Sequence, residues 1–277
     1  MGISLLEQIE EAVSFIKERI PEQYKIGIVL GTGLNKLVEE LSIHYVFDYK
    51  DIPHFPVSTV SSHDSKLIFG TLNEIPVVMM AGRFHYYEGY SMEQVTFGIR
   101  VLKYLGVEVL MLSNVTGGLN EEYEAGDIVV VKDHINLHPE NPLRGFNDER
   151  IGPRFPDMSE AYDPELRLMA LSILKENNIR YHQGIYVGLQ GPNLETPAES
   201  KYLQTIGGDI VGMSTVPEVI VARHMDMRTF AASIVSNMCF PLSSIKKTTI
   251  ESVIEVANLA EPKLGILFKE MVKSIEL

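Results

Sequence analysis

The chain has 277 residues, of which 45% are hydrophobic and 22% charged, the composition of an ordinary globular protein. Its formal net charge is −13, and so acidic a surface repels nucleic acid and anionic lipid, which excludes both as general partners. No run of residues approaches the roughly 18 consecutive apolar positions that a membrane helix requires, and the sole cysteine, Cys239, excludes an intrachain disulfide.

The segment 4–20 is predicted to be an amphipathic helix, because its apolar residues recur at helical spacing. Ser4 and Glu7 have the spacing of a capping box, and Pro21 ends the helix. The same segment lacks the basic start and apolar run of a secretory signal. Together with the single cysteine, this predicts a cytoplasmic protein.

Strands are predicted where short runs are rich in Val, Ile and Leu, as is typical of strands covered on both faces. In chain order these runs are 26–30, 66–70, 76–80, 107–112, 127–131, 184–190, 209–213 and 229–235. Predicted helices alternate with them: one capped by Ser91 and Gln94 that ends at Gly106, one over 164–177, two that begin at Thr196 and Thr215, and one over about 251–275. This alternation predicts an α/β fold.

The stretch 133–163 contains too many Pro, Gly and Asn residues for regular structure. A linker is one interpretation. The stretch also carries several Phe, Ile and Leu residues, which favour an ordered loop, and long ordered loops are usually functional.

Polar clusters follow several predicted strands, where open α/β sheets bind their ligands. The clusters are Gly31-Thr32-Gly33, Arg83–Tyr90, Asn114–Gly118, Gly191–Glu199 and Met213–Glu218. We therefore expect a site at this edge of the sheet.

Gly31-Thr32-Gly33 allows backbone N–H groups to approach an anion, and Thr32 adds a hydroxyl donor. Lys36 stands where the dinucleotide fingerprint needs its third glycine, and the Walker pattern is absent. A plain tight turn is an equally good interpretation.

Arg83 and His85 are two residues apart, so in a strand both side chains would point the same way. An arginine and a histidine on one side suit an oxyanion such as phosphate. The alternative is a surface ion pair with Glu88. Tyr86 and Tyr87 could pack in the core or form the wall of a pocket.

Three further side chains each have two interpretations. Glu195 precedes a helix start, where it either favours the helix dipole or accepts a ligand N–H. Ser214 precedes another helix start and could donate its hydroxyl to an anion. Asn237 follows the last predicted strand and is either a turn residue or an amide that reads a ligand.

Other chemistries are disfavoured. His134 and His138 are four residues apart, but Pro139 follows and the segment is not a convincing helix, so a zinc pair is not expected. The sequence around Ser214 lacks the second glycine of a nucleophile elbow. Cys239 is better interpreted as a small buried apolar residue than as a nucleophile.

Considered together, the motifs resemble those of the trimeric purine nucleoside phosphorylases, in the branch that acts on inosine and guanosine. The resemblance extends from about residue 5 to 275 and rests on GTGL (31–34), GRFHYYEGY (82–90), NVTGGLN (114–120), GDIVVVKDHINL (126–137), NPLRGFNDERIGPRFPDMSEAY (141–162), GPNLETPAE (191–199) and VGMSTVPEVIVARH (211–224). It implies a single α/β domain over 1–277, with a central mixed, twisted, partly barrel-like sheet flanked by helices. The implied reaction is reversible phosphorolysis of a purine nucleoside to free purine and ribose 1-phosphate, in purine salvage. No metal or organic cofactor is implied, and phosphate is a co-substrate.

The resemblance also implies roles for individual residues. Phosphate would be held by Thr32, His63, Arg83, His85, Val115 and Ser214. The purine would contact Val115, Thr116, Gly117, Leu194, Glu195 and Asn237. The sugar would contact Tyr87, Met213, Ile250 and Phe155, the last from the neighbouring subunit of a homotrimer. The catalytic residues would be His85, Glu195 and Asn237, because Glu195 accepts N1–H of a 6-oxopurine and Asn237 bonds to O6 and N7.

The sequence departs from the family pattern at three places. Leu194 replaces the usual phenylalanine, and Val115-Thr116 replaces two alanines. Ile250 stands where a histidine usually bonds the 5′-hydroxyl, so an alternative is a 5′-methylthioadenosine phosphorylase or a variant tolerant at the 5′ position. Asn237 argues against that branch, which uses an aspartate there. A non-catalytic binding protein is a third hypothesis, but it would not need both Glu195 and Asn237.

Overall fold

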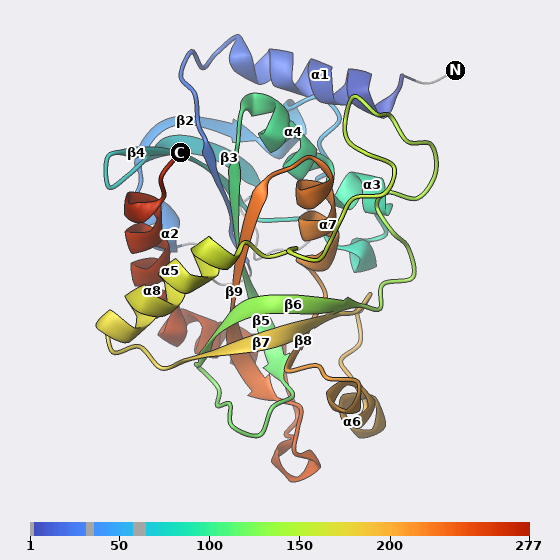
Figure 1. Ribbon diagram of the computed structural model, residues 1–277, viewed down its shortest axis with the longest axis vertical. Coiled ribbons are helices and arrows are strands. Elements are labelled where there is room, and N and C mark those ends of the chain that lie inside the picture. The colour runs from blue at the N-terminus through green and yellow to red at the C-terminus, as the bar shows by residue number, and fades with distance from the viewer. Residues whose placement is uncertain (1–2, 32–35, 58–64) are drawn as a thin grey trace.

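The computed structural model describes residues 3–31, 36–57 and 65–277, and shows an α/β fold (Figure 1). Within these ranges, nine strands form one mixed sheet in the order β2-β3-β4-β1-β5-β8-β7-β6-β9. Their bounds are β1 Ile26–Val29, β2 Ser42–Asp48, β3 Lys66–Leu72, β4 Ile75–Ala81, β5 Val109–Gly118, β6 Ile128–Asn136, β7 Tyr181–Gly188, β8 Ile210–Gly212 and β9 Arg228–Met238. The helices are α1 Leu5–Lys17, α2 Lys36–Glu39, α3 Met92–Val95, α4 Phe97–Leu105, α5 Pro164–Glu176, α6 Pro197–Thr205, α7 Val216–His224 and α8 Ile250–Ser274.

The sheet is partly closed into a barrel, because β5 pairs with β8 on one side and with β9 on the other. Strands β8, β7, β6 and β9 are hydrogen-bonded in sequence, so this second pairing joins the two ends of the series. The predicted fold class, a mixed and partly barrel-like sheet flanked by helices, is confirmed.

The central strands separate two hydrophobic layers, which explains their continuous apolar runs. In β9, Phe230, Ala232 and Ile234 pack in one layer, whereas Ala231 and Val235 pack in the other. Helices α1, α4 and α7 cover the second layer, and α2, α5 and α8 cover the first (Figure 1). In the described part of the chain, no helix combines the length and apolarity needed to cross a bilayer.

The predicted helix starts are formed as expected. Ser4, Ser91 and Thr196 each accept a hydrogen bond from the backbone three residues on, and the side chain at that position bonds back to the cap. The helix predicted after Ser91 is divided at Thr96, however, whose hydroxyl donates to the Met92 carbonyl at 2.8 Å. This competition from a side-chain hydroxyl separates α3 from α4.

Two predictions about strands were wrong. Strand β2 was not predicted, because it is an edge strand whose residues are mostly exposed and lack a buried apolar run. Strand β6 continues to Asn136, into the stretch predicted to lack regular structure, because pairing with β7 extends to Gly188. The remaining stretch, 137–163, is a loop as expected.

Candidate active site

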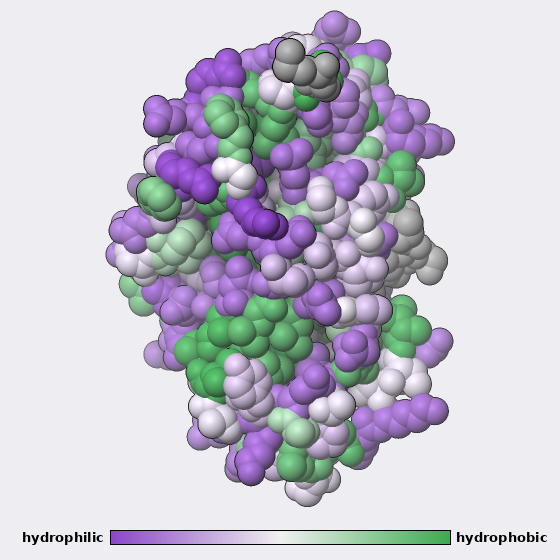
Figure 2. All heavy atoms as spheres, turned by 90° about the vertical axis from the view of Figure 1, so that its right-hand side faces the viewer, coloured by the Kyte–Doolittle hydropathy of each residue, from purple (hydrophilic) through white to green (hydrophobic). Residues whose placement is uncertain are grey.

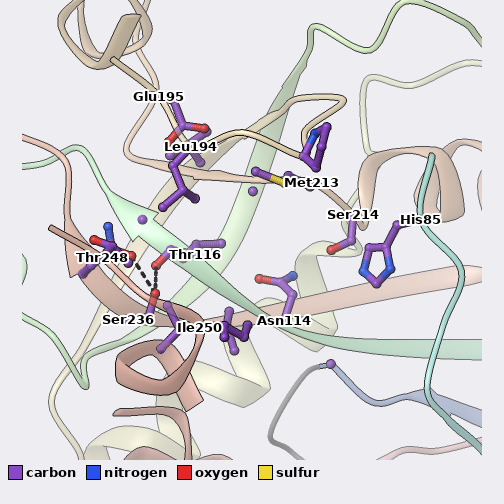
Figure 3. A pocket seen from close by; sticks show the side chains of 18 of the residues that line it. His85, Asn114, Thr116, Leu194, Glu195, Met213, Ser214, Ser236, Thr248 and Ile250 are labelled. Carbon is purple, nitrogen blue, oxygen red and sulfur yellow. Dashed lines mark hydrogen bonds between the residues drawn. The ribbon is translucent and has the colours of Figure 1, made fainter. Parts of the chain in front are cut away.

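The predicted edge of the sheet carries a cavity of about 390 Å³. Strands β1, β4, β5 and β9 run parallel, so their carboxyl ends meet at this point. The loop before α6, the end of β8 and the start of α8 complete the walls. Figure 3 shows His85, Asn114 and Ser214 at one end, and Leu194, Glu195, Thr116, Ser236 and Thr248 at the other, with Met213 and Ile250 between them.

Arg83 is fixed at the first end of the cavity and is only 1% exposed. Its Nη1 donates to Ser214 Oγ at 3.0 Å, its Nη2 donates to the Val29 carbonyl at 3.3 Å, and its Nε lies 3.4 Å from Glu218 Oε1. A buried guanidinium held beside a hydroxyl is suited to bind an oxyanion.

Ser214 is aimed into the cavity by a strained turn. Thr215 has φ 65° and ψ −54°, and the Val216 N–H donates to the Ser214 carbonyl at 2.7 Å, which together form a γ-turn with positive φ. For a β-branched residue this backbone costs on the order of 1–3 kcal/mol. Asn114 Nδ2 compensates by donating to Thr215 Oγ1 at 2.8 Å. The turn places the Ser214 hydroxyl just ahead of α7, whose N-terminus is its positive end.

His85 and Tyr87 form the wall beside Arg83. Their rings are stacked with centroids 4.7 Å apart. His85 Nδ1 lies 3.0 Å from Glu88 Oε1, with both side chains buried. The alternative of a surface ion pair is therefore wrong, because the Glu88 pair is internal and Arg83 is paired with Glu218. Burial raises the pKa of the Tyr87 phenol to about 12, so the Tyr87 hydroxyl stays neutral and can donate a hydrogen bond to a ligand.

At the other end of the cavity, Glu195 presents a carboxylate. The N-terminus of α6 is capped by Thr196 and Glu199, so Glu195 is not used as the cap and lines the cavity. Burial raises its pKa above the ordinary value. A partly desolvated carboxylate at this point is a strong acceptor for a ligand N–H.

Asn237 reaches the cavity through a bulge in β9. Thr116 pairs with Val235 and Gly117 pairs with Asn237, so Ser236 is an extra residue in the ladder. Ordinary strand alternation would send residues 236 and 237 to opposite faces. The bulge re-aims the chain, and both side chains line the cavity.

The middle of the cavity is lined by Met213 and Ile250 (Figure 3), and Val253 is a further apolar lining residue. Ile250 begins α8 and is 58% exposed. Thr248 and Thr249 lie beside it. Thr249 caps α8, since its Oγ1 accepts from the Ser252 N–H at 3.2 Å.

The structure brings together most of the side chains that the sequence singled out. The cavity is lined by Arg83, His85, Tyr87, Val115, Thr116, Gly117, Leu194, Glu195, Met213, Ser214, Asn237 and Ile250. Thr32 and His63 lie outside the described residues. Phe155 does not line the cavity and is 87% exposed.

Sequence reasoning gave no site role to Ser236, Thr248 or Cys239, although they line the cavity. Their proximity to other site motifs in the chain was the only signal that could have indicated them. Cys239 is buried, which raises the pKa of its thiol to about 12, and this agrees with its interpretation as a non-nucleophilic residue.

Over the described ranges, no three His, Cys, Asp or Glu side chains are grouped as a metal site would require.

Comparison with known proteins identifies this arrangement. A family model for the phosphorylase superfamily matches residues 25–273. Purine nucleoside phosphorylase 1 of Bacillus subtilis is 48% identical over 97% of this chain and 97% of its own length. The purine nucleoside phosphorylase of Mus musculus is 43% identical over 98% of this chain and 96% of its own length. The chain belongs to the purine nucleoside phosphorylases.

Solved structures agree with this assignment to the purine nucleoside phosphorylases. Isoform 2 of the Schistosoma mansoni purine nucleoside phosphorylase, in complex with cytosine and ribose-1-phosphate, has a TM-score of 0.93 and 40% identity, covering 98% of this chain and 97% of its own. A Schistosoma purine nucleoside phosphorylase in complex with hypoxanthine has the same TM-score and identity over the full length of both chains. The chain is therefore an enzyme with the purine nucleoside phosphorylase fold.

Proposed function

We propose that the enzyme cleaves 6-oxopurine ribonucleosides and deoxyribonucleosides, inosine and guanosine among them, with phosphate, in purine salvage. The observation that carries this proposal is that Glu195 and Asn237 both line the cavity. Glu195 and Ser236, which is hydrogen-bonded to Asn237, lie at the end opposite Ser214 (Figure 3). A carboxylate and an amide together match the N1–H, O6 and N7 atoms of a 6-oxopurine. The ribose-1-phosphate and hypoxanthine bound in the two Schistosoma structures support the same substrates.

The chemistry would use both ends of the cavity at once. A phosphate oxygen attacks C1′ of the sugar, the bond from C1′ to N9 breaks, and its electron pair moves onto the purine. The sugar passes through an oxocarbenium-like state, so the phosphate charge beneath it is stabilising. Arg83, His85 and Ser214 would hold the phosphate. Thr32 and His63 would join them, as the resemblance implies.

The leaving purine would be stabilised by hydrogen bonds that strengthen as charge develops. Glu195 accepts N1–H, and Asn237 contacts O6 and N7. Adenine lacks the N1–H donor and would leave the Glu195 carboxylate without a partner. A buried polar group left unpaired is how a site rejects an analogue by large factors. Val115, Thr116, Gly117 and Leu194 would surround the base, and Tyr87 and Met213 would contact the sugar.

The direct test is release of hypoxanthine from inosine with and without phosphate. We expect release to require phosphate and to fall by at least about 100-fold in Glu195→Ala and in Asn237→Ala, with no loss of thermal stability. Release that continues without phosphate, or inosine left intact, would contradict the proposal. Binding of inosine without turnover would instead support a non-catalytic protein.

One observation favours a second candidate, a 5′-methylthioadenosine phosphorylase or a 5′-tolerant variant. Ile250 lines the middle of the cavity and cannot donate a hydrogen bond to a 5′-hydroxyl. If Ile250 only relaxes the 5′ end, 5′-deoxyinosine will be a good substrate and methylthioadenosine a poor one. The reverse order would favour the second candidate.

We also propose that the enzyme is a cytoplasmic homotrimer that uses no metal or organic cofactor. Phe155 is 87% exposed, so its side chain is accessible to a neighbouring subunit, where the resemblance places it. Figure 2 shows a further apolar patch in the lower half of one face, at the height of β6, β7 and α6. Exposed apolar side chains in this part of the chain include Leu137, Tyr202 and Ile206. Phe155 would reach the sugar site of the neighbouring subunit.

A further inference from the structure

The side-chain amide of Asn237 is held at both of its ends. Ser236 Oγ donates to Asn237 Oδ1 at 2.8 Å, and Asn237 Nδ2 donates to Cys239 Sγ at 3.3 Å. Across the described residues, the amide makes no other hydrogen bond within the chain. A primary amide has two acceptor positions on oxygen and two N–H donors. One of each therefore remains for a ligand.

The two groups that hold the amide are themselves fixed to β5. The Cys239 N–H donates to the Gly118 carbonyl at 2.7 Å, which fixes the backbone that carries the thiol. The Ser236 hydroxyl also lies 3.2 Å from the Thr116 carbonyl, so its one proton is shared between that carbonyl and Asn237 Oδ1, as the dashed lines in Figure 3 show. The positions of the hydroxyl and the thiol are thus set by the sheet.

Gly117 makes this arrangement possible. A Cβ atom at this position would lie 2.5 Å from Cys239 Sγ and 3.7 Å from Asn237 Nδ2. The first distance is far inside van der Waals contact, so a side chain here would displace the thiol. The missing side chain lets the sulfur approach the sheet closely enough to meet the amide.

We propose that Cys239 is a positioning residue that orients the Asn237 amide for the departing purine, with Ser236 as the second anchor. This inference rests on the proposed function. With the amide fixed, Nδ2 offers its remaining N–H to O6. As the C1′–N9 bond breaks, N7 of the base takes a proton from solvent water, and Oδ1 offers its remaining lone pair to that N7–H. An amide free to rotate would lose part of this alignment each time charge develops on the base.

The thiol is suited to this role because it is neutral. Burial, reinforced by the nearby Glu195 carboxylate, raises its pKa to about 12, so no thiolate competes with the base for charge. The thiol also packs in a small cluster with Leu119, Val187, Leu203 and Val211. Removing it could therefore act through packing alone, and the experiment must separate the two effects.

A double-mutant cycle on kcat/KM for inosine makes this separation. We expect Cys239→Ala to lower kcat/KM roughly 5-fold, the size of one neutral hydrogen bond, mostly in kcat. Cys239→Ser, which matches alanine in size but keeps a hydrogen-bonding atom, should stay within about 2-fold of the wild type. In an Asn237→Ala background, Cys239→Ala should change kcat/KM by less than about 2-fold. Ser236→Ala, which removes the other anchor without opening the apolar cluster, should behave as Cys239→Ala does.

Other results would overturn the inference. Equal losses for Cys239→Ala and Cys239→Ser would indicate packing, as would a loss of kcat/KM that parallels a lower melting temperature. A loss of the same size in the Asn237→Ala background would show that the thiol acts without the amide. If wild-type enzyme releases hypoxanthine and Asn237→Ala does not, but Cys239→Ala is unchanged, this inference fails while the proposed function stands. If wild-type enzyme does not cleave inosine, the proposed function itself fails.

Discussion

The guanidinium of Arg83 is paired with the carboxylate of Glu218 at 3.4 Å, with the two side chains only 1% and 3% exposed. Glu218 also accepts the Thr215 N–H at 3.0 Å, so one carboxylate both balances the buried charge and supports the strained turn before α7. Phosphate would bind next to a charge that is already compensated in the free enzyme.

Glu218→Gln is therefore expected to destabilise the enzyme by about 3 kcal/mol, because it leaves the Arg83 charge buried without a counter-ion. Phosphate should restore much of this loss, since the anion would supply the missing charge and bind only the folded state. Thermal unfolding with and without phosphate measures both effects. Glu165→Gln is the matched control: Glu165 pairs with Arg228 but is 83% exposed, so its loss should change stability by no more than about 0.5 kcal/mol. An equal phosphate shift in wild type and Glu218→Gln would contradict this account.

Glu195 should determine the acid limb of activity. Its carboxylate must be ionised to accept N1–H, and burial raises its pKa above the ordinary 4.5. The profile of kcat/KM for inosine should therefore fall at a pH above 4.5, and Glu195→Gln should lack this limb as well as most activity. Glu199→Gln is the control, since Glu199 caps α6 and its own pKa is lowered by the Thr196 cap. If the acid limb of the kcat/KM profile shifted in Glu199→Gln, the limb would not report the ionisation of Glu195.

The raised pKa of Glu195 also predicts how the thermal stability of the enzyme changes with pH. A carboxyl whose pKa is raised on folding contributes stability in acid, and this contribution is lost as pH rises through the folded pKa. Glu195→Gln should thus unfold at a higher temperature than wild type at pH 7. The difference should disappear below the ordinary pKa of 4.5. Melting curves across this range check the sign, and a Glu195→Gln variant less stable at pH 7 would refute it.

Ile250→His should restore a donor for the 5′-hydroxyl. Because Ile250 is 58% exposed, the change should leave stability almost unaffected. The ratio of kcat/KM for inosine to that for 5′-deoxyinosine should rise roughly 5- to 10-fold, the size of one hydrogen bond. Ile250→Val, which stays apolar, should leave the ratio unchanged. A ratio that rises equally in both variants would show that side-chain size, and not hydrogen bonding, controls the 5′ end.

Phe155→Ala tests the contribution of a neighbouring subunit. Light scattering of the wild-type enzyme should give a mass of about 93 kDa, which corresponds to three chains of 31.1 kDa. In Phe155→Ala, kcat/KM for inosine should fall at least about 10-fold. Phe146→Ala is the matched control, because Phe146 is an equally exposed phenylalanine of the same loop, at 95%, for which the resemblance implies no role in a neighbouring site. A monomeric enzyme with full activity would exclude the shared site.

Residues that carry their own local signal were predictable from the sequence. Capping pairs such as Thr196 and Glu199 depend on three-residue spacing, and the central strands depend on runs of Val and Ile. The edge strand β2 carries no such run, so only its pairing with β3 defines it. The side-chain contacts of the site likewise join residues that are far apart in the sequence. The Arg83 pair with Glu218 joins residues 135 positions apart, and neither local sequence contains a sign of the other.

The bulge at Ser236 divides β9 into two parts with separate constraints. Before the bulge, successive side chains of β9 pack alternately in the two hydrophobic layers. A substitution that changes side-chain volume at these positions therefore alters the packing of several helices. After the bulge, Asn237 and Cys239 line the cavity, whereas Met238 between them packs against the hydrophobic core. Of the residues after the bulge, Asn237 belongs to neither hydrophobic layer, so it is the position in this segment where evolution, or an engineer, can change base preference without repacking the interior.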